Sequence, residues 1–495
     1  MKKRITYLCL IVGIIMLLAG CSAKESASAE KVISVGFTDV LDHLDNHQYS
    51  MNATAIATGP IHRCMFEYDK DMNICGAVVE EWDWVEDTKM EFTVRKGMKF
   101  HNGREVTAKD IKENIEQVLV PEFGYKNQVK LASIESVEVY DDLHGALILN
   151  GPDSGIMDAL TWLAIIPMET YDKQATAPVG CGPFKFESYE IGQELVMVKN
   201  PDYYEADKIW ADKIIMRFFG ESSTMMSAFL AHEIDSIFQA QPEDLGTLRG
   251  TENVMVENNN IIGNNYLAIN VERPPFDNKL LRQAIKYAID KEQLLKLAYE
   301  NEAVILSTGI MPSDTFYDNS FEYGRDLEKA KQLLTEAGYP DGLEIDIYTQ
   351  AVTMNGAVAD IISNNLADIG IKANVIKEEV GASVARGFGS HDYGLFFCGD
   401  VGSPNPLTVC QNYFGSGNIM NYNNDDVNAL IEKGRSTYDQ SQWKGIYHDL
   451  YAITEDDTPI VWLAATNCYA ARWNNLNGVI LRSNYYNSWE YATKE

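Results

Sequence analysis

One continuous stretch carries the signals of a strand, a turn and a helix start: Phe92-Thr93-Val94-Arg95-Lys96-Gly97-Met98-Lys99-Phe100-His101-Asn102-Gly103-Arg104-Glu105-Val106-Thr107-Ala108-Lys109-Asp110. Residues 91–95 alternate apolar and polar side chains, which predicts a strand, and His101-Asn102-Gly103 predicts a turn. Thr107 is a good N-cap residue, and Asp110 stands where a capping box places an acidic residue. The apolar residues that follow share one face of the expected helix: Ile111, Ile115, Val118 and Leu119.

The rest of the chain continues this alternation of strands and helices. Further apolar runs predict strands at residues 32–37, 344–348, 371–375 and 459–463. Helices are predicted to begin at a cap on Asp277, to run from Asp326 to a stop at Gly338, and to cover roughly residues 358–369. The pattern indicates α/β lobes, and a chain of 495 residues is too long for one core, so we expect two or three lobes.

The N-terminus has the pattern of an export signal. A basic start, Lys2-Lys3-Arg4, precedes an apolar run at residues 5–18 that is shorter than the ~20 residues of a membrane span. The run ends in Leu18-Ala19-Gly20-Cys21, which resembles the lipobox of bacterial lipoproteins. We therefore expect a signal peptide at residues 1–20, a lipid on Cys21 and a flexible tether at residues 21–31; the alternative is an ordinary signal peptide with an incidental cysteine.

Composition and cysteine usage narrow the function classes. The net charge of −31 is spread along the chain and repels nucleic acid and anionic lipid headgroups, so we expect no nucleic-acid partner. Six cysteines lie beyond the signal and lipidation positions, which permits disulfides in an exported protein. The close pairs are Cys64 with Cys75 and Cys398 with Cys410, and the sequence leaves the pairing open.

The sequence contains none of the catalytic motifs that define common enzyme classes. It has no G-x-S-x-G, no H-E-x-x-H and no Walker A loop, and Ser236 stands where a zinc-protease helix starting at His232-Glu233 needs its second histidine. His43, His47 and His62 lie close together in the sequence, but we interpret them as loop residues rather than metal ligands. We expect no enzyme activity, no cofactor and no metal.

Several blocks together resemble the bacterial extracellular solute-binding proteins of family 5, the peptide- and nickel-type receptors of ABC importers. The stretch from Phe92 to Asp110 is close to that family's F-x-L-R-x-G-V-K-F-x-D-G-x-P-x-T-A-x-D-V pattern. Other blocks occur in the family's order: Ala77-Val78-Val79-Glu80-Glu81-Trp82, Gly180-Cys181-Gly182-Pro183-Phe184, Lys199-Asn200-Pro201-Asp202-Tyr203-Tyr204, the segment from Leu267 to Asp290, and Glu336-Ala337-Gly338-Tyr339-Pro340-Asp341-Gly342. Most of these residues suit turns and caps, so they identify a fold more than a ligand.

The resemblance implies an α/β, two-lobed periplasmic-binding-protein fold of type II, peptide-binding-like, with an extra subdomain in the first lobe. By analogy, lobe I contains residues 32–57, 180–264 and 470–495, and the extra subdomain contains residues 58–179. Lobe II would span residues 265–469. The segments that cross between the lobes then fall near Gly263–Tyr266 and near Thr466–Ala471.

The resemblance also points to ligand-binding residues. Peptide-binding members place an aspartate just after a lobe II strand, where it pairs with the ligand's ammonium group, and Asp400 matches that position. The other candidates are polar, aromatic or cationic residues near the expected cleft: Tyr266, Asn264, Asn270, Phe397, Tyr413, Arg386, His62 and Arg63. Dipeptide-type members carry an arginine in the loop matching residues 348–352, and this chain has none, which favours a longer peptide.

We therefore predict a monomeric, lipid-anchored, extracytoplasmic binding subunit of an ABC importer, most consistent with peptides as ligands and a membrane permease and ATPase as partners. One alternative within the same fold is a receptor for nickel or a metallophore complex, to which His62 and Arg63 are suited. Alternatives of other classes are a non-transport surface receptor or chaperone and an exported hydrolase.

Overall fold

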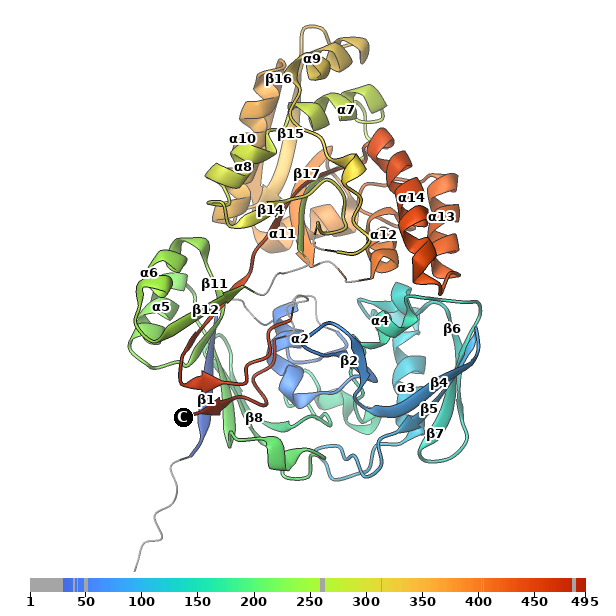
Figure 1. Ribbon diagram of the computed structural model, residues 1–495, viewed down its shortest axis with the longest axis vertical. Helices are drawn as coiled ribbons and strands as arrows, with labels where there is room; N and C mark the ends of the chain where they lie inside the picture. Colours follow the sequence, from blue (N-terminus) through green and yellow to red (C-terminus); the bar gives the residue numbers. More distant parts are fainter. Residues whose placement is uncertain are drawn as a thin grey trace, which may run out of the picture.

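The structure is a computed structural model that describes residues 30–38, 41, 43–48, 52–258, 263–312, 314–401, 403, 405–482 and 487–495. The expected signal peptide, Cys21 and nearly all of the expected tether lie outside these residues. Within the described part of the chain, no helix has both the length and the apolar character needed to cross a membrane. Figure 1 shows two bodies stacked along the long axis of the molecule.

The first lobe is built on a seven-stranded sheet of order β12-β19-β11-β1-β10-β9-β8. Its strands are β1 (Val32–Phe37), β8 (Phe184–Glu190), β9 (Glu194–Lys199), β10 (Lys213–Phe218), β11 (Ser236–Ala240), β12 (Val254–Asn258) and β19 (Tyr469–Trp473). The helices of this part are α2 (Asn52–Thr58), α5 (Ser222–Leu230) and α6 (Leu245–Gly250), and the short strands β20 (Leu476–Asn477) and β21 (Thr493–Lys494) pair near the C-terminus. The predicted first strand is confirmed, and it pairs in parallel with β10 and β11 near the centre of the sheet.

A subdomain with its own core is inserted between β1 and β8. A four-stranded sheet of order β4-β5-β7-β6 packs with α3 (Ala108–Val118), and a hairpin of two short strands lies beside it. The strands are β2 (Phe66–Tyr68), β3 (Ile74–Gly76), β4 (Val79–Glu86), β5 (Lys89–Val94), β6 (Ile134–Val139) and β7 (His144–Leu149). The short helix α4 (Ile156–Leu160) and the 3-10 turn η3 (Gln128–Leu131) lie on the side of the subdomain that meets the second lobe.

The second lobe contains a six-stranded sheet of order β14-β18-β13-β17-β15-β16. Its strands are β13 (Gly263–Ile269), β14 (Ala303–Ile305), β15 (Leu343–Gln350), β16 (Ile371–Glu378), β17 (Leu395–Val401) and β18 (Ile460–Thr466). Its helices are α7 (Lys279–Ala288), α8 (Lys291–Leu297), α9 (Leu327–Glu336), α10 (Thr353–Ala367), α11 (Val380–Val384), α12 (Pro406–Phe414), α13 (Asp425–Arg435) and α14 (Trp443–Asp457). Separate apolar cores involve its two faces, one with Leu267 and Phe397 and the other with Tyr266 and Phe396.

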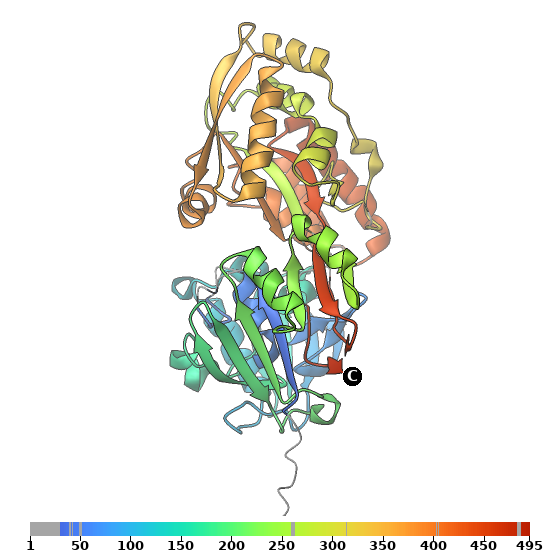
Figure 2. The same ribbon diagram turned by 90° about the vertical axis from the view of Figure 1, so that its left-hand side faces the viewer.

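The two lobes are linked by neighbouring strands. In the first lobe β12 pairs with β19, and in the second lobe β13 pairs with β18. Because β12 and β13 are successive strands, as are β18 and β19, the chain passes between the lobes at two adjacent places. Figure 2 shows a green and a red segment running side by side from one lobe to the other.

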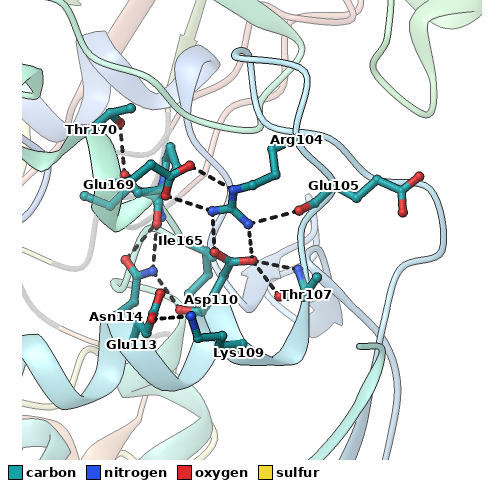
Figure 3. Close-up of polar contacts among 12 residues, drawn as sticks. Arg104, Glu105, Thr107, Lys109, Asp110, Glu113, Asn114, Ile165, Glu169 and Thr170 are labelled. Atoms are coloured by element: carbon teal, nitrogen blue, oxygen red, sulfur yellow. Dashed lines mark hydrogen bonds and ion pairs between the residues drawn. The ribbon is translucent and has the colours of Figure 1, made fainter. Parts of the chain in front are cut away.

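The stretch that opens the sequence analysis folds as predicted. Thr107 and Asp110 form a reciprocal capping box, in which the Thr107 backbone N donates to Asp110 Oδ2 at 2.8 Å. Arg104 Nη2 lies 2.6 Å from Asp110 Oδ1, and Arg104 Nε lies 2.8 Å from Glu169 Oε1, so the turn is tied to the helix start (Figure 3). These charges therefore join the turn at Arg104 to the start of α3 and to Glu169.

Three expectations need correction. The helix predicted to be capped by Asp277 is α7, and Asn278 caps it instead, accepting from Leu280 N at 3.0 Å. The helix expected over about 358–369 is α10, which already starts at Thr353. Its first turn contains Gly356, a residue of low helix propensity, so the sequence did not indicate this early start. Neither close pair forms a disulfide: within the described chain no cysteine is bonded to another, and the β2–β3 hairpin places Cys75 opposite Glu67 rather than Cys64.

Candidate functional site between the lobes

A cavity of about 1390 Å³ lies between the first lobe, its subdomain and the second lobe. One wall comes from residues of the first lobe and subdomain: Gln48, Phe238, Lys126, Asn127, Lys130 and Trp162. The opposite wall comes from β13, β17 and the helices behind them, and it is rich in amide side chains: Asn264, Asn265, Gln350, Asn355, Gln411 and Asn412. Such a wall offers donors and acceptors to a ligand that has its own polar backbone.

A second hollow, of about 760 Å³, lies on the surface beside α3. Its charged side chains already pair with one another, Arg104 with Asp110 and Glu169, and Lys109 with Glu113 at 3.0 Å (Figure 3). We therefore take the cavity between the lobes as the candidate ligand site.

Asp400 is the carboxylate of the second-lobe wall. It lies near the end of β17, on the same strand face as Phe396 and Cys398, which are buried in an apolar core. Asp400 thus stands where this apolar face reaches the cavity. Tyr266 Oη donates to Asp400 Oδ2 at 3.3 Å, and Tyr413 Oη donates to Asp400 Oδ1.

The surroundings of Asp400 disfavour its negative charge. Burial raises the pKa of Asp400 to about 6, although the hydrogen bonds from Tyr413 and Tyr266 and the charges of Lys130 and Lys126 act in the opposite direction. Both hydroxyl donors come from the second lobe, and the side chain stays partly exposed. The carboxylate can therefore accept a cationic group of a ligand, which would stabilise its ionised form.

Asn264 and Tyr413 support this wall. Asn264 Nδ2 donates to Gly309 O and to Tyr413 Oη, each at 3.2 Å. The Tyr413 ring packs edge-on against Tyr266, with centroids 5.2 Å apart, and against Trp462 at 4.7 Å. The predicted residues Asn264, Tyr266, Tyr413 and Asp400 therefore form one connected group, in which Asn264 and Asp400 line the cavity directly.

Three other predicted residues of the second lobe lie away from the cavity lining. Phe397 is fully buried in the core on the other face of β17. Asn270 Nδ2 donates to His391 O at 2.9 Å. Arg386 pairs with Glu378 at 2.7 Å and with Asp392 at 3.2 Å, so its charge is engaged within the lobe.

His62 and Arg63 form part of a buried cluster in the first lobe. Arg63 lies 3.4 Å from Glu67 and 3.5 Å from Glu490, and its Nε donates to Tyr203 Oη at 3.1 Å. Burial lowers the pKa of His62 to about 3, and neither ring nitrogen has a hydrogen-bond partner within the described structure. Neither residue lines the cavity.

The structure arranges no group of three or more His, Cys, Asp or Glu side chains for a metal ion among the residues it describes. His47, which the sequence places near His62, is buried with Nε2 2.7 Å from Ala164 O. His43 Nε2 lies 2.9 Å from Gln48 O.

Sequence reasoning missed the wall contributed by the subdomain. Lys126 and Lys130 flank and occupy the turn η3, and Lys130 Nζ lies 5.2 Å from the centre of the Trp162 ring. No motif marks these residues, because they reach the cavity only through the way the subdomain folds against the second lobe. A lysine-rich turn in an acidic chain was the sole signal available.

Comparison with known proteins identifies the family. Residues 73–421 match the model of the bacterial extracellular solute-binding proteins, family 5. The chain belongs to this family. Members of family 5 bind solutes outside the cytoplasm and are not enzymes, so the predictions of family, fold class and absence of catalysis are confirmed.

Individual family 5 proteins align over most of the chain. The Heme-binding protein A of Haemophilus influenzae is 27% identical over 462 residues, covering 85% of this chain and 84% of that protein. The Glutathione-binding protein GsiB of Salmonella choleraesuis is 26% identical, covering 93% and 94%. The periplasmic binding protein DppA from Helicobacter pylori, solved with the peptide STSA, has a TM-score of 0.84 and 25% identity, covering 94% and 98% of the two chains.

Proposed function

We propose that this family 5 protein captures peptides for an ABC importer. The observation that carries the proposal is Asp400, a partly buried carboxylate that faces a cavity of about 1390 Å³ and, among the residues that the structure describes, has no donor from the opposite lobe. A peptide's terminal ammonium is a suitable partner for such a group, and the amide-rich wall suits a peptide backbone. The relatives named for glutathione and the solved complex with the peptide STSA support this ligand class.

Capture works through lobe closure in this proposal. A ligand that contacts both walls binds the closed arrangement more tightly than an open one, and so shifts the population toward the closed form. The closed protein then docks on the permease, and ATP hydrolysis by partner subunits drives transport. The chain supplies binding energy and shape, and it breaks no bond.

The anchoring and domain boundaries are part of the proposal. We propose that Cys21 carries lipid, that residues 21–31 tether a monomer to the outer side of a bacterial membrane, and that residues 58–179 form the extra subdomain of lobe I. The proposed lobes, residues 32–57 with 180–264 and 470–495 against residues 265–469, are supported by the separate sheets. Mass spectrometry of the membrane-extracted protein would show a diacylglycerol mass on Cys21, and its absence would refute the anchor.

The test of ligand class is native mass spectrometry of the purified protein without its signal and tether, followed by denaturation to identify what it carries. We expect a set of peptides that is lost on Asp400→Ala and retained on the control Asp392→Ala, an exposed second-lobe carboxylate paired with Arg273 and Arg386. A single metal-containing molecule that survives Asp400→Ala would refute the peptide assignment and favour the nickel or metallophore alternative. Unchanged peptide uptake after gene deletion would instead favour a non-transport receptor or chaperone.

A further inference from the structure

The cavity has charges of opposite sign on opposite walls. Asp400 supplies the negative charge on the second-lobe wall, and Lys126 and Lys130 supply positive charge on the subdomain wall. Each side affects the other: the charges of the two lysines lower the pKa of Asp400, and the charge of Asp400 raises that of Lys130. Because all three side chains line one cavity, a single ligand can experience both charges.

Lys130 is held in a setting that favours an anionic partner. Its side chain is half-buried, and its Nζ lies over the Trp162 ring at 5.2 Å. Within the described structure it forms no ion pair with a carboxylate, and Asp158, whose charge it feels, is already occupied by three hydroxyl donors. Burial lowers the pKa of Lys130, and an anionic ligand group beside its ammonium would act in the opposite direction.

The arginines of the second lobe do not offer the same opportunity. Arg435 lines the cavity, but its Nη2 lies 3.6 Å from Glu432, which lines it as well. The loop at residues 348–352 contributes Gln350, an uncharged side chain. Arg386 is paired with Glu378 and Asp392.

We propose that Lys130 binds an anionic group of the ligand, so that the receptor selects peptides whose free carboxylate reaches the subdomain wall while their ammonium group is held by Asp400. This inference rests on the proposed peptide function and deepens it. The ligand is then a zwitterion that bridges the lobes, with one charge on each wall. Neutralising its carboxylate removes the contact with the subdomain and leaves the contact with Asp400.

The test compares short peptides as free acids and as C-terminal amides. Di-, tri- and tetra-alanine are titrated in both forms by calorimetry into the wild-type protein, Lys130→Met and Lys130→Arg. For the best-bound length, we expect the wild type to prefer the acid by about tenfold or more, as for a buried charge-assisted contact. Lys130→Met should reduce that preference to about twofold or less, whereas Lys130→Arg, which keeps the charge, should retain most of it.

Controls separate this effect from folding and from general charge. Methionine preserves the unbranched apolar stem over Trp162, and melting temperatures without ligand should match those of the wild type. Lys109→Met removes an equal charge from the exposed side of α3 and should leave the acid preference unchanged. An acid preference that persists in Lys130→Met, or equal binding of acids and amides by the wild type, would overturn the role of Lys130 while peptide binding stands. If no peptide binds the wild type in either form, the peptide assignment itself falls, and this inference with it.

Discussion

Asp158 and Asp400 are two carboxylates at the boundary between the lobes, and their hydrogen-bond donors come from different places. Asp158, on α4 of the subdomain, accepts from Tyr68 Oη at 2.5 Å in its own lobe, and from Ser403 Oγ at 3.1 Å and Thr408 Oγ1 at 2.8 Å in the second lobe. Asp400 accepts only from second-lobe tyrosines among the described residues. One carboxylate thus joins the lobes directly, whereas the other leaves the link between lobes to a ligand.

The neighbourhood of Asp158 strengthens this contrast. Ser154 N donates to Arg435 O at 2.9 Å, and Ser154 Oγ donates to Gly434 O at 3.0 Å, so the subdomain loop also docks on α13. Tyr438 Oη accepts from Asp153 N at 3.0 Å and donates to Asp87 O at 2.9 Å. Hydrogen bonds between protein residues alone therefore contribute to lobe closure, and a ligand in the adjacent cavity would add further contacts between the lobes.

The largest expected effect comes from removing the charge of Asp400. Asp400→Asn keeps the shape but leaves a buried ligand ammonium without its counter-ion, which typically costs about 2–5 kcal/mol, or roughly 30-fold or more in affinity. Calorimetry with a bound peptide measures this change. The matched control is Asp392→Asn, exposed on the same lobe, which should bind normally. Wild-type affinity in Asp400→Asn would contradict the proposal that Asp400, unlike Asp158, binds the ligand.

The capping box at Thr107 and Asp110 was predictable from local sequence, because it depends on residues only three positions apart. Asp400, the strand before it and the neighbouring Tyr266 and Tyr413 were instead identified through the resemblance to family 5. The one-residue shift from Asp277 to Asn278 shows the usual imprecision where two adjacent residues both suit a cap.

The wall formed by Lys130 and the contact made by Asp158 were not predictable in this way. Lys130 and Asp400 are far apart in the sequence and line the same cavity only because the subdomain packs against the second lobe. Asp158 lies in a short helix with no motif, and its partners Ser403 and Thr408 come from the other lobe. His62 and Arg63 show the converse, because residues that looked available for a ligand are buried among Glu67, Glu490 and Tyr203.

The next largest effect is expected from Asp158, which joins the two lobes without a ligand. Asp158→Ala leaves buried hydroxyl donors unpaired in the closed form, at a cost of about 1–3 kcal/mol, so ligand affinity should fall by about fivefold or more although Asp158 does not line the cavity. X-ray scattering should show a larger radius of gyration for the variant at a subsaturating ligand concentration.

Two further substitutions separate closure from folding at Asp158. Thr408→Val removes a donor from the opposite lobe and should lower ligand affinity, whereas Tyr68→Phe removes the donor from the same lobe and should mainly lower the melting temperature. Equal effects of the two variants on affinity would contradict the assignment of Asp158 to closure.

An effect of comparable size is expected from pH, and it should be confined to the ligand-binding carboxylate. Because the pKa of Asp400 is raised to about 6, the carboxylate is ionised above that pH and becomes neutral below it. A peptide α-ammonium, whose ordinary pKa is about 7.7–8.0, stays charged between pH 5 and pH 7, so affinity should be highest near pH 7 and fall about tenfold on going to pH 5. Calorimetry across this range checks the sign, and Asp400→Asn should remove the dependence. An unchanged affinity at pH 5 would mean that ammonium recognition does not use Asp400.

The smallest effects should come from removing the tyrosine hydroxyls that donate to Asp400. These substitutions test whether the two hydrogen bonds stabilise the ionised carboxylate. Each donor favours the ionised form, so removing one should raise the pKa of Asp400 and move the midpoint of the affinity profile to higher pH. Tyr413→Phe removes one hydrogen bond to Asp400, worth about 1 kcal/mol, and should weaken binding about fivefold. The same substitution removes the hydroxyl that accepts from Asn264. Tyr266→Phe, whose contact is 3.3 Å long, should weaken it about twofold. Tyr393→Phe, which loses a donor to Ile419 O elsewhere in the lobe, should leave the midpoint where it is. If neither Tyr413→Phe nor Tyr266→Phe moves the midpoint, the hydroxyls do not support the charge, and Asp400 must depend on the ligand and the subdomain lysines for its ionisation.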